Sequence, residues 1–479
     1  MKKLMFIFFI FSYTLVAFAD GNFDQFLSKE MGGFNEFKSD SDKGFYEYLK
    51  TGWEEFKAFS AIKRDEKPKI TKPPVVSVNE KKINFEKNTK LSNDIVIDRG
   101  NPENIKDQNP IKLGEQMENH ATNQSVEDLY RIDLDLSKYS KLSLIDKPIK
   151  AEKIAEVWKK MATGNYDILV EEIHKKGKKI GFDDWGYFKI VKKTADFIYP
   201  NAYNSRILLS WYMLMKLGYD VKLGYNNDAV YLLVPSNQQI YGAPFFNFSG
   251  IRYYIIWTDG RDIKTLYSYT GKYPEAEHTF AFKIESFMMP LDIKSRSVKF
   301  TYAGKQYLFN VYYNISNVDF YRDFPQVDLS VYHKADVSKM VAESVFNGLR
   351  DAIAGKSEVE AVNIILRFVQ TAFDYKTDQD QFGYEKYLLP DETVFYKYSD
   401  CEDRSILFSY LVRKLMGLEV VLLEYPGHIA TGVKFNTNFN GDKIRYGDKI
   451  YVICDPTYIN ADVGMAMPQF KNTNPKIIF

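Results

Sequence analysis

The chain contains few cysteines and histidines for its length. Of 479 residues, only Cys401 and Cys454 are cysteines and five are histidines. Two cysteines cannot form a disulfide scaffold, and a chain this long buries an ample core without one. The histidines are scattered, with no pair at the spacing of metal ligands. We therefore expect no bound metal and no cofactor.

An excess of charge of either sign is also absent. The chain has 64 Lys and Arg residues against 63 Asp and Glu residues, which gives a formal net charge of +1 at pH 7. This balance offers no electrostatic basis for binding nucleic acid or an anionic membrane surface. Long hydrophobic runs are missing too, because the most apolar segment, residues 4–18, is shorter than the roughly 20 residues that span a bilayer.

Residues 1–19 have the three regions of a secretory signal peptide. Two lysines follow Met1, an apolar segment comes next, and Ala17-Phe18-Ala19 supplies the small residues of a cleavage site. We expect the mature chain to begin at Asp20 and to have no integral membrane segment after cleavage. The style of the segment and the composition rich in Lys, Asn, Ile and Phe favour a bacterial protein that is periplasmic or secreted.

Aromatic residues, by contrast, are abundant, and near the N-terminus they recur every eleven positions. Each unit opens with a phenylalanine that is followed three positions later by a second aromatic residue, and the four units begin at Phe23, Phe34, Phe45 and Phe56. Eleven residues make three helical turns, so the repeat predicts a helical arm over residues 20–66 with one aromatic stripe. Such a stripe suits packing on the body of the protein and docking of a protein partner equally.

The following stretch, residues 67–130, is rich in Pro, Lys, Asn and Asp and poor in aromatic residues. This composition cannot bury enough apolar surface to offset the entropy of ordering, which predicts a disordered linker. The arm would then be tethered to the body and not integral to it.

Near the C-terminus, Cys401, His428 and Asp455 follow one another at equal intervals along the chain. The apolar residues after Cys401 recur at helical spacing, with Asp400 as a plausible N-cap, so the cysteine opens a helix. The free N–H groups of a first helical turn favour a thiolate. The acidic neighbours of Cys401 oppose a negative sulfur, however, so a cationic partner is needed.

His428 can be that partner, since it begins a run that reads as a strand. Asp455 closes the next strand, and strand alternation allows its carboxylate to accept a hydrogen bond from the imidazole. In such an arrangement the carboxylate fixes the imidazole tautomer, the imidazole takes the thiol proton, and the thiolate attacks a carbonyl carbon. Alternation also turns Cys454 to the other strand face, which argues against the main alternative, a disulfide between Cys401 and Cys454.

The three local sequences resemble the transglutaminase-like superfamily of papain-type enzymes. They are Asp400-Cys401-Glu402-Asp403-Arg404-Ser405, Gly427-His428-Ile429-Ala430-Thr431-Gly432-Val433 and Asp455-Pro456-Thr457-Tyr458. The resemblance covers residues 336–479 and implies an α+β catalytic domain with Cys401 as nucleophile, His428 as base and Asp455 as orienting acid. It does not fix the reaction, because the superfamily includes cross-linking enzymes, peptidases, amidases and inactive proteins.

A second copy of this pattern lies 199 residues upstream. The segment that starts at Ile207 aligns with the one that starts at Ile406, but the positions of the three site residues hold Ala202, Ala229 and Thr258. We interpret residues 131–290 as a degenerate transglutaminase-like domain, against the alternative of chance similarity between two amphipathic helices that end in glycine. Residues 291–335 between the copies predict a β-rich connection with a hairpin at Ala303-Gly304-Lys305.

The sequence therefore predicts an exported cysteine-dependent acyl-transfer enzyme with a polypeptide substrate. We expect it to hydrolyse peptide or side-chain amide bonds, because water is concentrated outside the cell and nothing in the chain identifies an amine acceptor site. Two alternatives remain open: a cross-linking transglutaminase, and a catalytically inactive binding or scaffold protein of the cell envelope.

Overall fold

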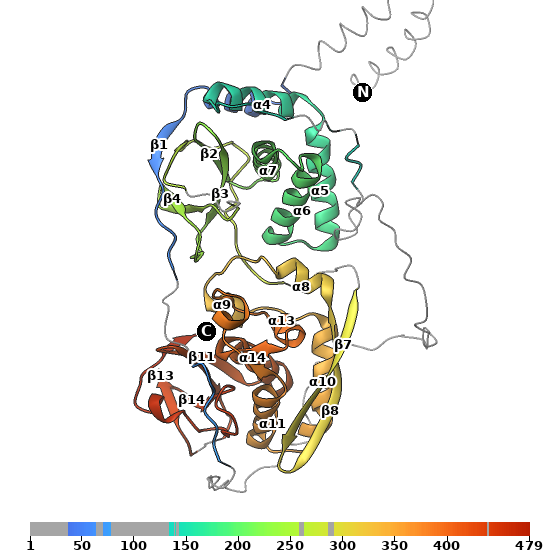
Figure 1. Cartoon of the computed structure of the whole chain (residues 1–479), viewed down its shortest axis with the longest axis vertical. Helices are drawn as coiled ribbons and strands as arrows, with labels where there is room; N and C mark the ends of the chain where they lie inside the picture. Colours follow the sequence, from blue (N-terminus) through green and yellow to red (C-terminus); the bar gives the residue numbers. More distant parts are fainter. Residues whose placement is uncertain are drawn as a thin grey trace, which may run out of the picture.

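The computed structural model describes residues 37–63, 70–77, 134–137, 139, 143–257, 263–285, 292–437 and 440–479. It has an α+β fold with two lobes stacked along the long axis of the molecule (Figure 1). The expected signal peptide, the first unit of the aromatic repeat and Phe34 of the second unit lie outside the described residues.

Helices of the first lobe pack against one face of a six-stranded sheet. The helices are α3 (Asp40–Leu49), α4 (Ala151–Thr163), α5 (Tyr166–Ile180), α6 (Asp184–Ile198) and α7 (Tyr203–Lys216). The sheet, in spatial order, consists of β1 (Glu54–Lys57), β6 (Thr265–Ser268), β2 (Lys222–Tyr225), β3 (Val230–Ser236), β5 (Ile251–Tyr254) and β4 (Phe245–Phe248). Helix α7 is buried nearly all round, which explains its continuous apolar run and makes it the centre of the lobe.

The second lobe begins with a hairpin and ends with a five-stranded sheet. The hairpin strands are β7 (Ile293–Tyr302) and β8 (Lys305–Asn314). The helices are α8 (Ile315–Tyr321), α9 (Leu329–His333), α10 (Lys339–Ile353), α11 (Glu358–Thr371), α12 (Asp378–Gln381), α13 (Pro390–Phe395) and α14 (Cys401–Met416). The sheet, in spatial order, consists of β13 (Lys443–Tyr446), β14 (Lys449–Cys454), β12 (His428–Lys434), β11 (Glu419–Tyr425) and β15 (Lys476–Ile478). A short parallel pair, β9 (Asp374–Tyr375) and β10 (Tyr398–Ser399), leads into α14.

The two sheets share one strand order. In the first lobe the order is β6-β2-β3-β5-β4, with β1 added outside β6, and in the second lobe it is β15-β11-β12-β14-β13. Neighbouring strands are antiparallel in both sheets. In both lobes a long helix, α7 or α14, directly precedes the two central strands.

The described part of the expected helical arm is built into the first lobe. Phe45 in α3 is 3% exposed and packs edge-on against Trp158, with ring centroids 4.8 Å apart. Phe56, in the fourth repeat unit, lies in strand β1 and is paired with Leu266 of β6. Helix α3 thus forms within the expected arm, but it is part of the lobe and not a tethered unit. The helical prediction is wrong for residues 54–57, because sheet pairing at the lobe edge overrides the helical spacing of the aromatic residues there.

A short part of the expected disordered linker is also ordered, and it contacts the second lobe. The backbone N–H of Val76 donates to the Ile459 carbonyl at 2.9 Å, and the N–H of Ile459 donates to the Pro74 carbonyl at 3.0 Å. Val76 itself is buried. The prediction of disorder is therefore wrong for residues 70–77, and the rest of residues 67–130 lies outside the described residues.

The expected hairpin forms, but it does not join the halves. Strands β7 and β8 meet at Ala303 and Gly304, whose positive φ angles of 48° and 79° are those that a tight two-residue hairpin turn requires. Val298 and Val311 of the hairpin are buried with residues of α10 and α11, so the hairpin belongs to the second lobe (Figure 1). Residues 315–335 then form helices α8 and α9 where a β-rich connection was expected.

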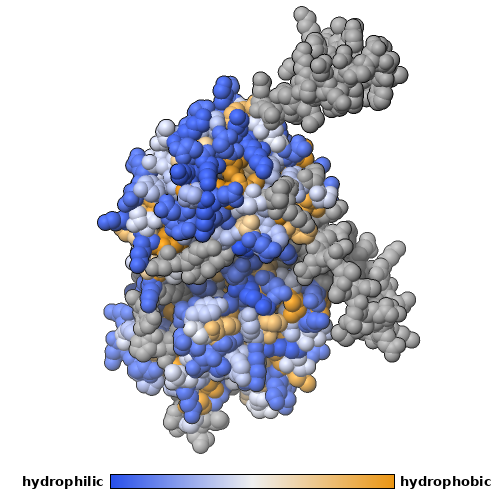
Figure 2. Space-filling view, turned by 45° about the horizontal axis from the view of Figure 1, so that its top comes forward, coloured by the Kyte–Doolittle hydropathy of each residue, from blue (hydrophilic) through white to orange (hydrophobic). Residues whose placement is uncertain are grey.

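Hydrophilic residues cover most of the described surface on the face shown in Figure 2, and apolar residues gather there only in small patches. Among the helices within the described ranges, none is long and apolar enough to cross a membrane.

Candidate active site

Cys401 is the first residue of helix α14, as its sequence context predicts. The preceding Asp400 has the extended conformation of an N-cap, and its N–H donates to Asp403 Oδ2 at 3.2 Å. The cysteine is 1% exposed and is not in a disulfide. Cys454 is also a free, buried thiol, and burial raises its pKa far above the usual range. The alternative of a disulfide between the two cysteines is therefore not realised.

His428 and Asp455 meet across two neighbouring strands. His428 opens β12, Asp455 follows β14, and the Nε2 atom of the imidazole lies 2.8 Å from Asp455 Oδ2. Both residues are 2% exposed. The other carboxylate oxygen, Oδ1, accepts the backbone N–H groups of Thr457 and Tyr458 at 2.9 and 3.2 Å. These two N–H groups stabilise the charged carboxylate and hold it toward the imidazole.

The contact with Asp455 assigns separate roles to the two ring nitrogens of His428. A carboxylate acceptor at Nε2 favours the tautomer that carries its proton there, which leaves Nδ1 as a proton acceptor. Nδ1 is buried and has no hydrogen-bond partner among the described residues. Phe470 stacks on the imidazole, with centroids 5.2 Å apart and planes at 11°, and so limits rotation of the ring.

Two buried side chains, Ser405 and Gln370, tie the helix, the strand and the loop of the site together. Ser405 Oγ in α14 donates to the Ile429 carbonyl, next to His428, at 3.0 Å. Gln370 Nε2 in α11 contacts the carbonyl oxygens of Asp455 and Tyr458 at 3.0 and 2.8 Å. Both groups hold backbone beside a site residue.

Arg404 is a site residue that sequence reasoning missed. Its guanidinium is buried below the first turn of α14 and donates to Ser399 Oγ and to the carbonyls of Gln370 and Phe373, at 3.2, 3.3 and 2.8 Å. Burial lowers the pKa of Arg404 to about 10, although Tyr375 and the neighbouring acidic groups oppose the shift, so the cation persists at neutral pH. Arg404 lies three residues after Cys401, so the two residues share one face of the helix. A charged residue inside an otherwise apolar helix is the signal in the sequence that indicates a buried charge there.

The cysteine sulfur also contacts its neighbour in the chain. Cys401 Sγ lies 3.0 Å from Glu402 Oε2, and both residues are buried. A carboxylate acceptor at this distance stabilises the thiol proton and opposes formation of the thiolate.

Cys401 and His428 line one cavity of about 520 Å³. Tyr241 of the first lobe and Ile62 of the N-terminal segment also line this cavity, so it lies where the two lobes approach each other. A cavity of this size between structural units suits a small ligand or a few residues of a polypeptide.

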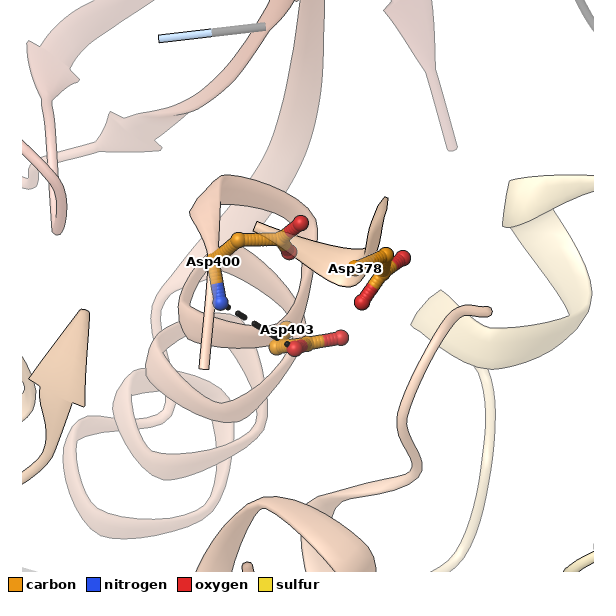
Figure 3. A group of neighbouring side chains, drawn as sticks. All are labelled: Asp378, Asp400 and Asp403. Carbon is orange, nitrogen blue, oxygen red and sulfur yellow. Dashed lines mark hydrogen bonds between the residues drawn. The ribbon is translucent and has the colours of Figure 1, made fainter. Parts of the chain in front are cut away.

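A cluster of buried carboxylates stands beside Cys401 (Figure 3). Asp378 of α12, Asp400 and Asp403 each offer an oxygen, and these oxygens lie within 4.8 Å of one another. Burial, together with the charges of Asp400 and Glu402, raises the pKa of Asp403 well above its usual range. Backbone N–H groups of Leu388 and Lys386 donate to Asp403 and Asp378 at 2.8 Å each and offset part of the repulsion between these carboxylates. The spacing of the histidines and cysteines, on which the expectation of no metal was based, does not bear on this group, because it consists of carboxylate oxygens, the kind of ligand that Ca²⁺ and Mg²⁺ take.

The corresponding positions of the first lobe lack these functional groups. Ala202 caps α7 and Ala229 directly precedes β3, so neither can act as nucleophile or base. Thr258 lies outside the described residues.

Comparison with known proteins adds no identification. No family model, no curated protein sequence and no solved structure matches this chain.

Proposed function

We propose that the protein is a cysteine-dependent acyl-transfer enzyme that hydrolyses peptide or side-chain amide bonds. The observation that carries the proposal is the contact between His428 Nε2 and Asp455, which leaves Nδ1 without a hydrogen-bond partner on a histidine that lines the same cavity as Cys401. A thiol, an imidazole with an unpartnered ring nitrogen and an orienting carboxylate are the groups that nucleophilic acyl transfer uses, and their presence at one cavity supports the proposal.

In the proposed mechanism, His428 Nδ1 takes the proton of Cys401 and the thiolate attacks the carbonyl carbon of the substrate. The resulting imidazolium gives its proton to the leaving amine, and the acyl group stays on sulfur. His428 then removes a proton from water, which attacks the thioester and releases the acid. Asp455 stays ionised throughout and stabilises the imidazolium.

We further propose that the second lobe is a transglutaminase-like domain and that the first lobe is a degenerate copy of it. Besides the sequence alignment, the shared strand order of the two sheets and the long helix before each central pair support this proposal. The proposed cellular location, the periplasm or the outside of a bacterial cell, depends on residues 1–19 alone.

A specific observation favours a second candidate, a binding or scaffold protein that keeps the fold without catalysis. Cys401 is buried and its sulfur contacts Glu402, an arrangement that suits an inert thiol. The first lobe would then be an example of the same loss in this chain.

The rate of Cys401 alkylation by iodoacetamide between pH 5 and 9 separates the two candidates. For the enzyme we expect fast alkylation well below the ordinary thiol pKa of about 8.5, and loss of that low-pH rate in His428→Ala. His174→Ala, at an exposed position of α5, is the matched control. Alkylation that rises only near pH 8.5, or is unchanged in His428→Ala, would support the scaffold. If the thiol is active, incorporation of a labelled amine into protein in place of hydrolysis would identify a cross-linking transglutaminase.

A further inference from the structure

Residues 58–63 follow strand β1 and lie along the first lobe (Figure 1). Phe59 and Phe245 exchange backbone hydrogen bonds as antiparallel strands do, with N to O distances of 2.8 and 3.2 Å. Three residues further on, the Ile62 carbonyl accepts the N–H of Gly242 at 2.9 Å. The first lobe therefore holds this part of the chain through backbone groups, in the manner of an added strand.

Residues 70–77 continue along the second lobe (Figure 1) and are held in a similar way. The Val76 N–H donates to the Ile459 carbonyl at 2.9 Å, and the Ile459 N–H donates to the Pro74 carbonyl at 3.0 Å. We call residues 58–63 and 70–77 together the strap. One stretch of chain thus pairs with both lobes in succession.

Both parts of the strap reach the candidate active site. On the first lobe, Ile62 lines the same cavity as Cys401. On the second lobe, the Ile70 carbonyl accepts the hydroxyl of Tyr375. The ring of Tyr375 lies against Arg404 in the first turn of α14, with its centroid 5.2 Å from the guanidinium carbon. Cys401 begins that helix and is 1% exposed, so the strap meets the site from both lobes where the thiol is closed to solvent.

The strap is held mainly through its backbone and buries little apolar surface. Phe59 and Val75 are 54% and 62% exposed, and Ile62 is only partly buried. Of the strap residues, all of which the structure describes, Val76 alone is buried. Segments with few buried apolar contacts open at a lower free energy than the core around them. The strap can therefore leave its place while both lobes stay folded.

We propose that the strap is an autoinhibitory element that covers Cys401, and that its release from the two lobes admits the substrate. This inference rests on the proposed acyl-transfer function and adds a control of access to the same site. Release frees the backbone groups of Gly242 and Phe245 that hold residues 58–63. An extended polypeptide can pair with the same groups by strand addition, so the strap and a polypeptide substrate compete for one place.

The rate of alkylation by iodoacetamide measures the covering directly, because the thiolate of Cys401 must reach the reagent to displace iodide. Val76→Asp places a charge at the buried anchor of the strap and should raise the rate at pH 8 by about tenfold or more. Val75→Asp, the matched control, adds the same charge one residue away at an exposed position and should leave the rate near that of the wild type. Ile62→Ala removes a side chain from the cavity wall and should raise the rate about threefold. Peptide mapping by mass spectrometry separates labelling of Cys401 from labelling of Cys454.

Hydrogen exchange followed by mass spectrometry checks the release itself. The amides of residue 76 and Ile459 should exchange faster in Val76→Asp than in Val75→Asp, whereas those of β11 and β12 should stay protected. A wild-type or slower alkylation rate in the released Val76→Asp protein and in Ile62→Ala overturns the inference. An equal rise in Val76→Asp and Val75→Asp also overturns it, because the added charge alone would then explain the rise.

Failure of the proposed function gives a different result. If the alkylation rate of Val76→Asp at pH 6 is the same with and without His428→Ala, the thiol is not activated by the imidazole and the enzymatic function is overturned, while a faster rate in Val76→Asp still supports a covering strap. Conversely, a low-pH rate that depends on His428 in the wild type and does not rise in Val76→Asp leaves the proposed function standing and overturns the strap.

Discussion

The imidazole of His428 and the carboxylate of Asp455 face each other at 2.8 Å, although 27 residues separate them in the chain. The contact forms because β12 and β14 are neighbouring antiparallel strands with Thr431 opposite Cys454. Continuing this register places Asp455 opposite Ala430, on the same strand face as His428. The geometry of the pair is therefore a property of the sheet, and it makes the role of the carboxylate testable.

Asp455→Asn should lower the hydrolysis rate on the order of 10²–10⁴-fold, because an amide neither stabilises the imidazolium nor enforces the tautomer with its proton on Nε2. Alkylation of Cys401 at pH 6 should slow in parallel, and mass spectrometry of the labelled protein measures it. Asp448→Asn, at an exposed turn before β14, is the control. Wild-type alkylation kinetics in Asp455→Asn would show that the carboxylate has only a structural role.

Arg404→Met should destabilise the second lobe by about 3–5 kcal/mol, since it leaves the carbonyls of Gln370 and Phe373 without their buried donor. Urea unfolding followed by circular dichroism measures this loss. Arg404→Lys keeps the charge but cannot reach all three acceptors, so an intermediate loss is expected. Equal stability of all three proteins would mean that the guanidinium contributes no net stabilisation.

Local signals in the sequence predicted the positions of the three site residues on their elements. Asp400 and the apolar spacing after it placed Cys401 at a helix start, and the strand patterns placed His428 and Asp455 at strand ends. Each of these signals depends only on residues that are close together in the sequence. The α+β class follows from the same patterns.

The neighbours of these residues could not be read from the sequence in the same way. Gln370 reaches the backbone of Asp455 from 85 residues away, and Phe470 stacks on His428 from another element, so only tertiary packing brings them together. The sequence prediction is most clearly wrong at strand β1. The periodicity of its aromatic residues favours a helix, but pairing with β6 makes this segment a strand. The group of Asp378, Asp400 and Asp403 was missed because Asp378 lies in a separate helix, α12, and only the fold brings it to the two aspartates at the start of α14.

Asp183 should make the first lobe less stable as the pH rises. It caps α6 through Oδ1, which accepts the Gly186 N–H at 2.8 Å, while the buried Oδ2 has no partner among the described residues. Burial raises the pKa of Asp183 to about 7 from the ordinary value of 3.8, so the folded protein holds a proton that the unfolded chain releases between these values. Stability from this group is present below pH 4 and is lost as the pH rises toward 7.

Asp183→Asn keeps the capping oxygen and removes the charge, so it should stabilise the protein at pH 8 by about 1–3 kcal/mol and have little effect at pH 4. Urea unfolding at the two pH values provides the comparison. Asp184→Asn, next in the chain, is not a neutral control because its carboxylate accepts from Tyr219. Exposed Asp228→Asn serves instead. Equal gains at both pH values would rule out the titration of Asp183 as the cause.

His333 should have the opposite effect on stability, making the protein less stable as the pH falls. It is buried in α9 beside α14, with its Nδ1 atom 3.2 Å from Ser409 Oγ. Burial, together with the nearby charge of Arg413, lowers the pKa of His333 to about 4 from 6.5. Between pH 4 and 6.5 the unfolded chain binds a proton at His333 and the folded protein does not. The contribution of His333 to the free energy of unfolding is therefore present above pH 6.5 and is lost as the pH falls to 4.

A full shift of this size corresponds to about 3 kcal/mol as an upper bound. His333→Gln removes the titrating group, so its stability should vary less than that of the wild type between pH 7 and 4.5, even if the substitution lowers stability at neutral pH by disturbing the packing of α9. His174→Gln, exposed on α5, is the matched control and should leave the wild-type pH dependence unchanged. If urea unfolding gives parallel pH profiles for wild type and His333→Gln, the acid sensitivity of the protein arises from other groups, and the buried imidazole is not the residue that limits its folding at low pH.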